Sequence, residues 1–260
     1  MQRWRRYYEC ALHGPSRAST LLNEVRNLPE IDLVKVTKNL PLLVVAPHPD
    51  DESLGCGGLI AQAARLGGKV HIVVVTDGAR SHPGSRTHPQ ERLRSLRRSE
   101  TIEAAAVLGV PAEQVSFLGL PDGHAPRSGE GARAAGQRLA SLANEFAVKT
   151  IFTSWNYDAH LDHVATYAYA CMAARKTGAS LFFYPVWAWM LPPATLVPKL
   201  RLKGFSLDIR DAVADKRAAV LKHRSQTSPL IDDDPSGFML SDEHLAAMIT
   251  SREFFIAASL

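Results

Sequence analysis

Cysteine is scarce in this sequence of 260 residues, and its three copies, Cys10, Cys56 and Cys171, form no Cys-x-x-Cys pair. Thiols that are so few and odd in number exclude a disulfide framework and favour a reducing compartment, which we take to be the cytoplasm. Long apolar runs are also missing, since none approaches the roughly 20 residues that a membrane-spanning helix needs. The basic start from Met1 to Tyr8 is followed by no apolar core or cleavage site, so we expect no signal peptide.

An excess of charge is missing too, because the formal net charge is only +4. The densest basic segment, Arg92 to Arg98, has helical periodicity but no aromatic residues between its charges, whereas nucleic-acid grooves combine basic and stacking side chains. We therefore expect a solvated helix face and no nucleic-acid partner. The length suits one large domain, which we place at residues 41–260 after an N-terminal extension of residues 1–40.

The sequence does contain a regular alternation of short β-branched runs and segments with helical periodicity. Strands are expected over 42–46, 70–76, 115–118, 150–153 and 181–184, and helices over 53–66, 89–108, 131–146 and 161–176. This alternation predicts an α/β fold: a Rossmann-like, doubly wound, mostly parallel sheet with helices on both faces. Outside this block we expect a helix over 19–28, a wall or lid at 187–190, a strand over 205–209, a helix over 211–223 and a C-terminal helix.

The first polar cluster directly follows the first expected strand. Residues 42–46 have the composition of a strand buried on both faces, and the sequence Pro-His-Pro-Asp-Asp-Glu follows at 47–52. Because proline cannot continue the strand, one imidazole and three carboxylates lie where the strand passes into a helix. Open α/β folds bind ligands at this rim. A helix cap would explain one carboxylate, but not three.

The second polar cluster, Asp158-Ala159-His160-Leu161-Asp162-His163, follows the fourth expected strand and opens a helix. In a Rossmann-like strand order the chain crosses back after its third strand, so the first and fourth strands flank the point where ligands bind. The two clusters should therefore converge on one crevice. His160 and His163, three residues apart, can face the same side of their helix.

Two imidazoles and one carboxylate suit zinc, and three protein ligands leave a position for water, as in catalytic sites. We predict His48, Asp51 and His163 as the ligands, with Zn2+ as cofactor and Fe2+ or another divalent metal as the alternative. Such a metal lowers the pKa of water from about 16 to about 7 and makes it a nucleophile near neutral pH.

The remaining groups of the two clusters suit proton transfer. Asp50 is free to act as the general base that takes the proton of the water. His160, held by a carboxylate such as Asp162, can donate to an oxyanion and later protonate an amine. From the residues alone, Asp50 and Asp51 could exchange roles, as could His160 and His163.

Both clusters carry a resemblance to a known family. The sequence Ala-Pro-His-Pro-Asp-Asp-Glu at 46–52 resembles the signature of the LmbE-like, or PIG-L-like, zinc-dependent de-N-acetylases, and residues 160–163 resemble that family's His-Pro-Asp-His. The resemblance runs from about Leu42 to about Gln226 and implies an LmbE-like metallohydrolase domain. It implies the zinc ligands, general base and intermediate-stabilising histidine already named. Leu161 departs from the family's proline but removes no ligand.

The resemblance also implies residues that the chemistry alone would not single out. The pattern Arg97-x-x-Glu100 matches a family motif whose arginine contacts the substrate, and Asp122 matches a carboxylate that helps to hold the sugar. A Lys…His-x-Ser-Gln pattern near the family's site is matched by Lys216, His223, Ser225 and Gln226.

These observations predict a metal-dependent hydrolase that removes an N-acyl group, expected to be N-acetyl, from an amino sugar or glycoconjugate of the N-acetylglucosamine kind. The expected partner is that small molecule, and no feature sets an oligomeric state. Two alternatives are an amidase acting on a larger thiol- or peptide-linked conjugate and a metal-binding member of the fold without turnover. Asp50 and His160 argue against the second, since a binder needs neither a spare base nor a spare acid. A phosphoesterase would need a second metal about 4 Å from the first, for which the rim offers few further carboxylates.

Overall fold

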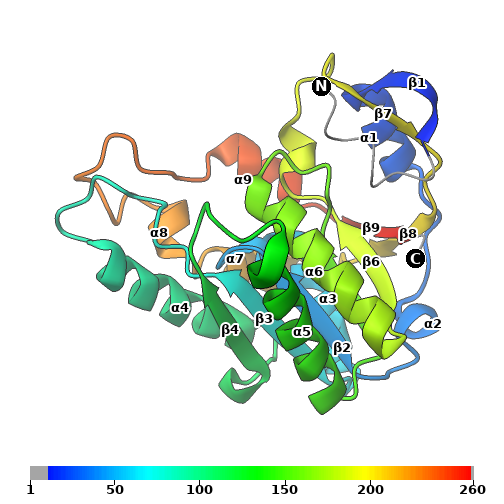
Figure 1. Cartoon of the computed structure of the whole chain (residues 1–260), viewed down its shortest axis with the longest axis horizontal. Helices are drawn as coiled ribbons and strands as arrows, with labels where there is room; N and C mark the ends of the chain where they lie inside the picture. The colour runs from blue at the N-terminus through cyan, green and yellow to red at the C-terminus, as the bar shows by residue number, and fades with distance from the viewer. Residues whose placement is uncertain (1–10, 259–260) are drawn as a thin grey trace.

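The computed structural model describes residues 11–258 and has at its centre a seven-stranded sheet in the order β4-β3-β2-β5-β6-β9-β8 (Figure 1). Its strands are β2 (Leu42–Ala46), β3 (Val70–Thr76), β4 (Val115–Leu120), β5 (Thr150–Ser154), β6 (Ser180–Tyr184), β8 (Gly204–Asp208) and β9 (Arg252–Ala257). From β4 to β6 all neighbours are parallel, whereas β9 pairs antiparallel with both β6 and β8. The predicted mostly parallel α/β sheet is confirmed.

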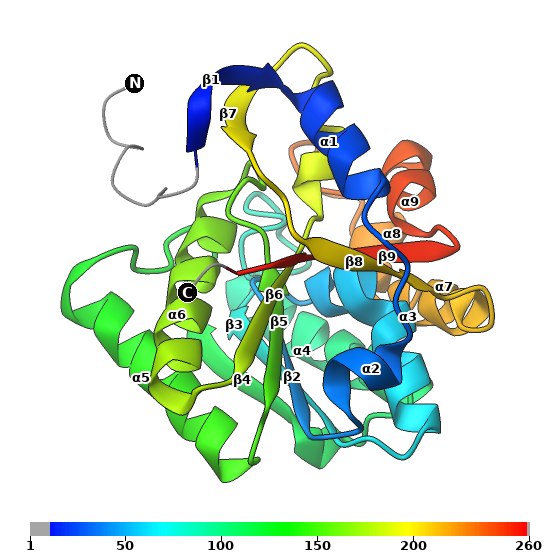
Figure 2. The ribbon, with the colours of Figure 1, turned by 90° about the vertical axis from the view of Figure 1, so that its right-hand side faces the viewer.

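Helices cover both faces of this sheet (Figure 2). One face carries α3 (Asp51–Arg65), α4 (Gln90–Val107) and α7 (Val213–Val220), and the other carries α1 (Ala18–Arg26), α5 (Gly129–Glu145) and α6 (Leu161–Thr177). Strand β2 shows why the sheet is doubly covered. Leu42, Val44 and Ala46 belong to one apolar core, and Leu43 and Val45 belong to the other. A strand packed on both faces needs such an unbroken apolar run.

The ends of the chain differ from the prediction. The expected C-terminal helix is only the short α9 (Asp242–Met248). After it the chain continues as strand β9, which lies between β6 and β8 in the sheet. A separate two-stranded antiparallel sheet of β1 (Ala11–Arg17) and β7 (Leu196–Leu200) was not predicted at all. The remaining elements are α2 (Leu33–Thr37), α8 (Arg224–Thr227) and the 3-10 helices η1 (Ala112–Gln114) and η2 (Trp187–Met190). Helix α1 packs in the same core as α5 and α6. The domain boundary near residue 40 stays a prediction.

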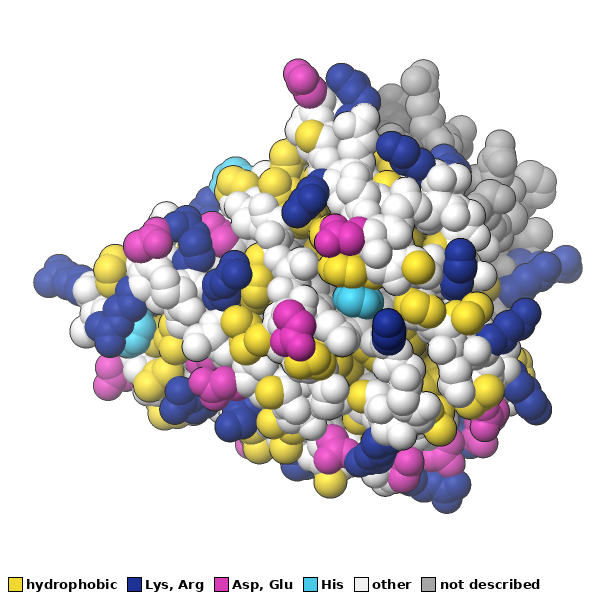
Figure 3. Space-filling model, turned by 90° about the horizontal axis from the view of Figure 1, so that it is seen from below, with side chains coloured by type: hydrophobic (Ala, Val, Ile, Leu, Met, Phe, Trp, Pro, Cys, Tyr) yellow, Lys and Arg dark blue, Asp and Glu magenta, His cyan; other side chains and the backbone are white. Residues whose placement is uncertain are grey.

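The helices, surface charges and thiols of the described residues bear on the expectations from composition. Within residues 11–258 no helix combines the length and apolar character needed to cross a membrane. On the face seen in Figure 3, Lys and Arg side chains are interspersed with Asp and Glu and form no continuous basic path. Cys56 and Cys171 are free thiols. The predictions for Met1 to Tyr8 and for Cys10 lie outside the described residues.

A buried ion pair joins β9 to α7 beside α3. Lys216 Nζ donates to Glu253 Oε1 over 2.7 Å, and the same carboxylate accepts the backbone N–H groups of Gly58 and Leu59, each over 2.8 Å. Lys216 is 1% exposed and Glu253 is 3% exposed. This acidic residue interrupts the apolar pattern of β9, which explains why the sequence did not reveal the strand.

We expect Glu253→Ala to lower the free energy of unfolding by about 3–5 kcal/mol, because it leaves the Lys216 ammonium buried without a partner. Urea unfolding followed by circular dichroism measures the change. The matched control is the double variant Lys216→Met, Glu253→Gln, which removes both charges and keeps a carbonyl oxygen for the backbone N–H groups. It should regain most of the lost stability, and a single variant as stable as the unmodified protein would contradict this role for the pair.

Candidate active site

The two polar clusters meet at the carboxyl ends of β2 and β5, which are neighbours in the sheet. A cavity of about 510 Å³ opens there. Six of the predicted site residues line it: His48, Asp50, Asp51, Arg97, Asp122 and His160. The other two, Asp162 and His163, are buried in the first turn of α6 and contact His48 and Asp51 respectively. The structure therefore brings all eight predicted residues together.

One oxygen of Asp51 lies close to two imidazoles. Asp51 Oδ2 is 3.1 Å from His48 Nδ1 and 3.2 Å from His163 Nε2. Ligand atoms bound about 2.0 Å from a tetrahedral zinc ion lie about 3.3 Å apart, so these separations suit a shared cation. Within residues 11–258, His163 Nε2 is a buried atom without a hydrogen bond, and its nearest charged neighbour is this Asp51 oxygen, which is consistent with a metal ligand.

A further carboxylate holds the outer nitrogen of each ring. Asp162 Oδ2 lies 3.2 Å from His48 Nε2, and Asp158 Oδ2 lies 2.8 Å from His163 Nδ1. Metal-binding histidines almost always have such a partner, which fixes the orientation of the ring. No role was predicted for Asp158. Its place in the second cluster, beside two histidines, was the available signal.

The electrostatics of this cluster favour positive charge. Burial opposes a charge on His48, but hydrogen bonds with Asp162 and Asp51 raise its pKa to about 10. Burial lowers the pKa of His163 as well, but Asp51 and Asp158 outweigh it and raise that pKa to about 9. Burial alone would raise the pKa of Asp51, yet His163 and His48 hold it well below its usual range. A pocket with this preference fits a divalent cation bound by His48, Asp51 and His163.

Two groups of three side chains in the described part of the chain have ligand atoms close enough together to bind a cation, and neither includes Asp51. His48, His160 and His163 offer atoms within 4.8 Å of one another, and so do His48, Asp122 and Asp162. His160 is less suited than His163, because its Nδ1 already accepts the backbone N–H of Asp162 at the start of α6. Asp122 is 3.5 Å from His48 Nε2 and thus lies on the outer side of that ring. We therefore keep His163 as the ligand.

Asp162 does not hold His160, contrary to our expectation. Its carboxylate accepts the backbone N–H groups of Gly123 over 2.7 Å and Ala125 over 3.1 Å, and it contacts His48. The physical reason is that the turn after β4 exposes backbone donors that need an acceptor, and these donors turn the carboxylate away from His160. Sequence spacing within α6 could not reveal partners from another loop.

Asp50 lies beside the predicted metal ligands and has an unusual backbone conformation. Its φ of 148° is one that residues other than glycine rarely adopt. Arg97 stabilises it, because Nη2 donates to Asp50 Oδ2 over 3.0 Å and to the Pro49 carbonyl over 2.7 Å, and Nη1 donates to the Gly78 carbonyl. Burial raises the pKa of Asp50 to about 6, and the charge of Arg97 limits the rise. Arg97 therefore positions the predicted base, a contact that the resemblance did not imply.

His160 can present a donor to the cavity. Because its Nδ1 accepts the Asp162 N–H, the proton of the neutral ring lies on Nε2. Burial, with the nearby charges of His48 and His163, lowers the pKa of His160 to about 4 and keeps the ring neutral. A neutral imidazole that carries its proton on Nε2 can donate to a developing oxyanion.

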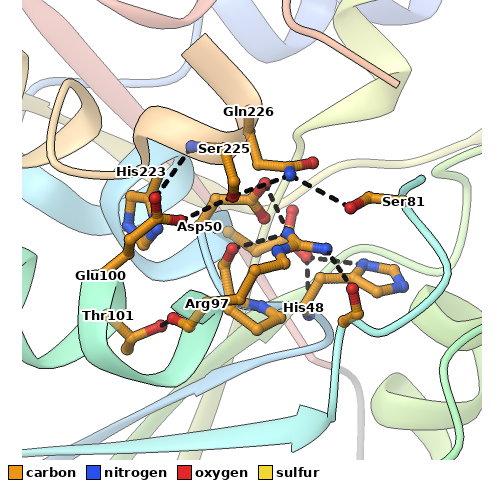
Figure 4. A network of polar contacts seen from close by, with 12 residues as sticks. His48, Asp50, Ser81, Arg97, Glu100, Thr101, His223, Ser225 and Gln226 are labelled. Atoms are coloured by element: carbon orange, nitrogen blue, oxygen red, sulfur yellow. Dashed lines mark hydrogen bonds and ion pairs between the residues drawn. The ribbon is translucent and has the colours of Figure 1, made fainter. Parts of the chain in front are cut away.

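Asp50 lies beside a buried network of polar side chains that includes Glu100, His223 and Ser225 (Figure 4). Glu52 accepts the backbone N–H of Asp50 over 3.1 Å and lies 3.0 Å from His223 Nε2. Glu100 accepts the backbone N–H of Ser225 over 2.8 Å and its hydroxyl over 2.6 Å. Neither Glu52 nor Glu100 was predicted to have a role, because the partners His223 and Ser225 are more than a hundred residues away in the chain.

The Lys…His-x-Ser-Gln pattern divides in the structure. Gln226 lines the cavity, whereas His223 and Ser225 belong to the buried network behind it. Lys216 is turned toward Glu253, in the ion pair that holds β9. The pattern therefore marks one cavity residue and three residues that support the surrounding fold.

One side of the cavity is apolar. Trp187 and Met190 of η2 line it together with Phe238, and the Trp187 and Phe238 rings pack edge to face with centroids 5.5 Å apart. The expected wall at 187–190 is confirmed for these two residues. Trp189 lines a different cavity, beside Lys216.

Comparisons with known proteins agree with this chemistry. The family model described as "PIG-L: GlcNAc-PI de-N-acetylase" matches residues 43–174, which include both polar clusters and about half of the chain. The chain is 28% identical over 235 residues to a 1D-myo-inositol 2-acetamido-2-deoxy-alpha-D-glucopyranoside deacetylase of Mycobacterium sp. (strain KMS), covering 72% of this chain and 74% of the relative. It is 32% identical over 170 residues to a mycothiol S-conjugate amidase of Streptomyces coelicolor, covering 58% of this chain and 56% of the relative.

A solved structure shows the same fold. The N,N'-diacetylchitobiose deacetylase from Pyrococcus horikoshii aligns with a TM-score of 0.60 over 95% of both chains, at 21% sequence identity. The fold, the matched motifs and the cluster of His48, Asp51 and His163 agree with one another. The chain therefore belongs to the PIG-L family of metal-dependent de-N-acetylases.

Proposed function

We propose that the protein is a zinc-dependent hydrolase that removes an acetyl group from the nitrogen of a small molecule containing N-acetylglucosamine. The observation that carries the proposal is the buried set His48, Asp51 and His163 beside Asp50 in a single cavity. The mycobacterial relative supports the sugar, because its name gives an acetamido-glucopyranoside as substrate. The free thiols Cys56 and Cys171 support the cytoplasm as the compartment.

The proposed reaction uses the side chains in the cavity as follows. Zinc held by His48, Asp51 and His163 would act as a Lewis acid, polarising the amide carbonyl and making water more acidic. Asp50 takes a proton from the attacking water while the new C–O bond forms. His160 donates from Nε2 to the carbonyl oxygen as that oxygen becomes negative. The proton on Asp50 then passes to the nitrogen as the C–N bond breaks, which gives the amine and acetic acid, and the acid ionises to acetate near neutral pH.

The substrate is positioned by residues around these groups. Asp122 lines the cavity and is the proposed partner for sugar hydroxyls. Arg97, which the resemblance assigned to the substrate, has two of its nitrogens committed to Asp50 and neighbouring carbonyls, so we assign it first to holding the base. The apolar side formed by Trp187 and Phe238 suits the less polar face of a sugar ring.

The test is an assay of both products with and without metal. Zinc-loaded protein is incubated with N-acetylglucosamine, N,N'-diacetylchitobiose and an N-acetylglucosaminyl inositol, and released acetate and primary amine are quantified. We expect equal amounts of the two products, loss of the activity after treatment with EDTA, and recovery when Zn2+ is restored. A parallel recovery with Fe2+ identifies the preferred metal.

Two results would speak against the proposal. Zinc-loaded protein that releases neither product from any of the three compounds would favour a metal-binding protein without turnover. Hydrolysis confined to larger thiol-linked conjugates would favour the amidase alternative, the activity for which the Streptomyces relative is named.

A further inference from the structure

Gln226 occupies an unusual position in the cavity wall. It lines the cavity that holds Asp50 and His160, yet the whole residue is only 1% exposed. Its Nε2 donates to Ser225 Oγ over 3.0 Å and to Ser81 Oγ over 3.2 Å, as Figure 4 shows. Both amide hydrogens are therefore used within the protein.

The neighbouring carboxylate fixes the orientation of this amide. Ser225 Oγ donates its hydrogen to Glu100 Oε2 over 2.6 Å. Since that hydroxyl has only one hydrogen, it can only accept from Gln226. The amide group facing Ser225 must then be the nitrogen, and a flipped amide would place two acceptors against each other. The chain from Glu100 through Ser225 thus holds the other amide atom, Oε1, in a defined place.

That oxygen lacks a partner. Gln226 Oε1 is a buried acceptor that makes no hydrogen bond within the described part of the chain. A buried carbonyl oxygen without a donor costs about 1–3 kcal/mol in desolvation, so such atoms are rare unless another molecule satisfies them. The side chain already lines the cavity, and a molecule bound there can supply the donor.

We propose that Gln226 Oε1 accepts a hydrogen bond from the substrate and so selects compounds that carry an N–H or O–H donor at this place. The inference rests on the proposed de-N-acetylase function and names a further specificity residue for it. In an N-acetylated amino sugar the donor has two sources, the N–H of the amide that is cleaved and a ring hydroxyl. A plain acyl chain has no such donor, so it does not satisfy this acceptor.

The test compares substrates that lack one donor each. N-acetylglucosamine is measured beside its 3-deoxy, 4-deoxy and 6-deoxy analogues and beside 2-O-acetylglucose, in which an ester oxygen replaces the amide N–H. Each is assayed by acetate release with the zinc-loaded protein and with Gln226→Met, which keeps the side-chain length and removes the acceptor. The control Gln137→Met changes an exposed glutamine of α5 and should behave as the unmodified protein.

We expect Gln226→Met to lower kcat/KM for N-acetylglucosamine about tenfold to a hundredfold. The ratio between the two proteins should fall toward one for the single analogue that lacks the relevant donor, because the lost contact cannot be lost twice. Collapse with the ester identifies the amide N–H, and collapse with a deoxy sugar identifies that hydroxyl. A merely structural role for Gln226 would leave the ratio the same for every analogue and would overturn the inference.

The unmodified protein gives an independent answer if the variant folds poorly, which its melting temperature and zinc content reveal. Its kcat/KM should be at least about tenfold lower for one of the deoxy analogues than for N-acetylglucosamine. If the donor is instead the amide N–H, the ester should be cleaved no faster than the amide, although its bond is more reactive. Equal treatment of all the deoxy analogues, together with fast cleavage of the ester, would refute the role of Gln226 while leaving the proposed function intact. No acetate from N-acetylglucosamine or its relatives would instead remove both proposals.

Discussion

Replacement of Asp50 by asparagine should lower kcat about a hundredfold to ten-thousandfold while leaving the metal in place, the range expected for loss of a general base. Asparagine keeps the size of the side chain and can still accept the hydrogen bond from Arg97, but it cannot take a proton from water. Asp50→Ala should lose hydrolysis as well, with an added cost in stability.

Zinc content, acetate release and the melting temperature are to be measured on the same preparations of this variant. Full zinc content with little acetate is the expected combination. If Asp50→Asn retained the activity of the unmodified protein, the base would have to be another residue. If the variant lost zinc, the roles of Asp50 and Asp51 would be exchanged.

The second large effect is expected for His163→Ala, which should lose its metal. His163 is 0% exposed, and its Nε2 faces Asp51 Oδ2. Removal of a partner outside the coordination sphere typically weakens metal binding about 10–100-fold, and removal of a ligand should weaken it more. Competition with a chromophoric chelator gives the affinity, and elemental analysis after gel filtration gives the content.

His160→Ala is the matched control for the metal-binding assignment. This imidazole belongs to the same helix end, and its ring centroid is 5.5 Å from that of His163. We expect the variant to retain zinc and to lose much of its activity, because the donor to the oxyanion is removed. Normal zinc binding by His163→Ala, with zinc lost from His160→Ala instead, would reverse the two roles.

The sequence predicted the sheet well because its strands carry two kinds of information. An apolar run such as Leu42 to Ala46 indicates burial on both faces, and the polar residues that follow it mark the carboxyl rim. Convergence of the clusters near His48 and His163 required only that β2 and β5 be neighbours, and they are. The predicted site residues could be found because catalysis needs polar and charged side chains at strand ends, where packing of the core does not require them.

The missed features depend on contacts between distant segments. Asp162 was assigned to His160 because the two are close in sequence, whereas backbone donors from the turn after β4 direct it to His48. Glu253 received no role from the sequence, because its buried partner Lys216 lies in α7, 37 residues away in the chain. Orientation of a carboxylate is set by its donors in space, and spacing along one helix does not contain them.

Asp158 joins the metal-binding cluster to the apolar side of the cavity. Its Oδ2 lies 2.8 Å from His163 Nδ1, while Oδ1 accepts the backbone N–H of Ala188 over 2.8 Å, and the N–H of Val186 lies 3.1 Å from both oxygens. The orientation of the predicted ligand His163 and the position of the segment that carries Trp187 therefore depend on the same carboxylate. Because thermodynamic coupling is reciprocal, a molecule that binds against Trp187 and the proposed cation should each raise the other's equilibrium affinity.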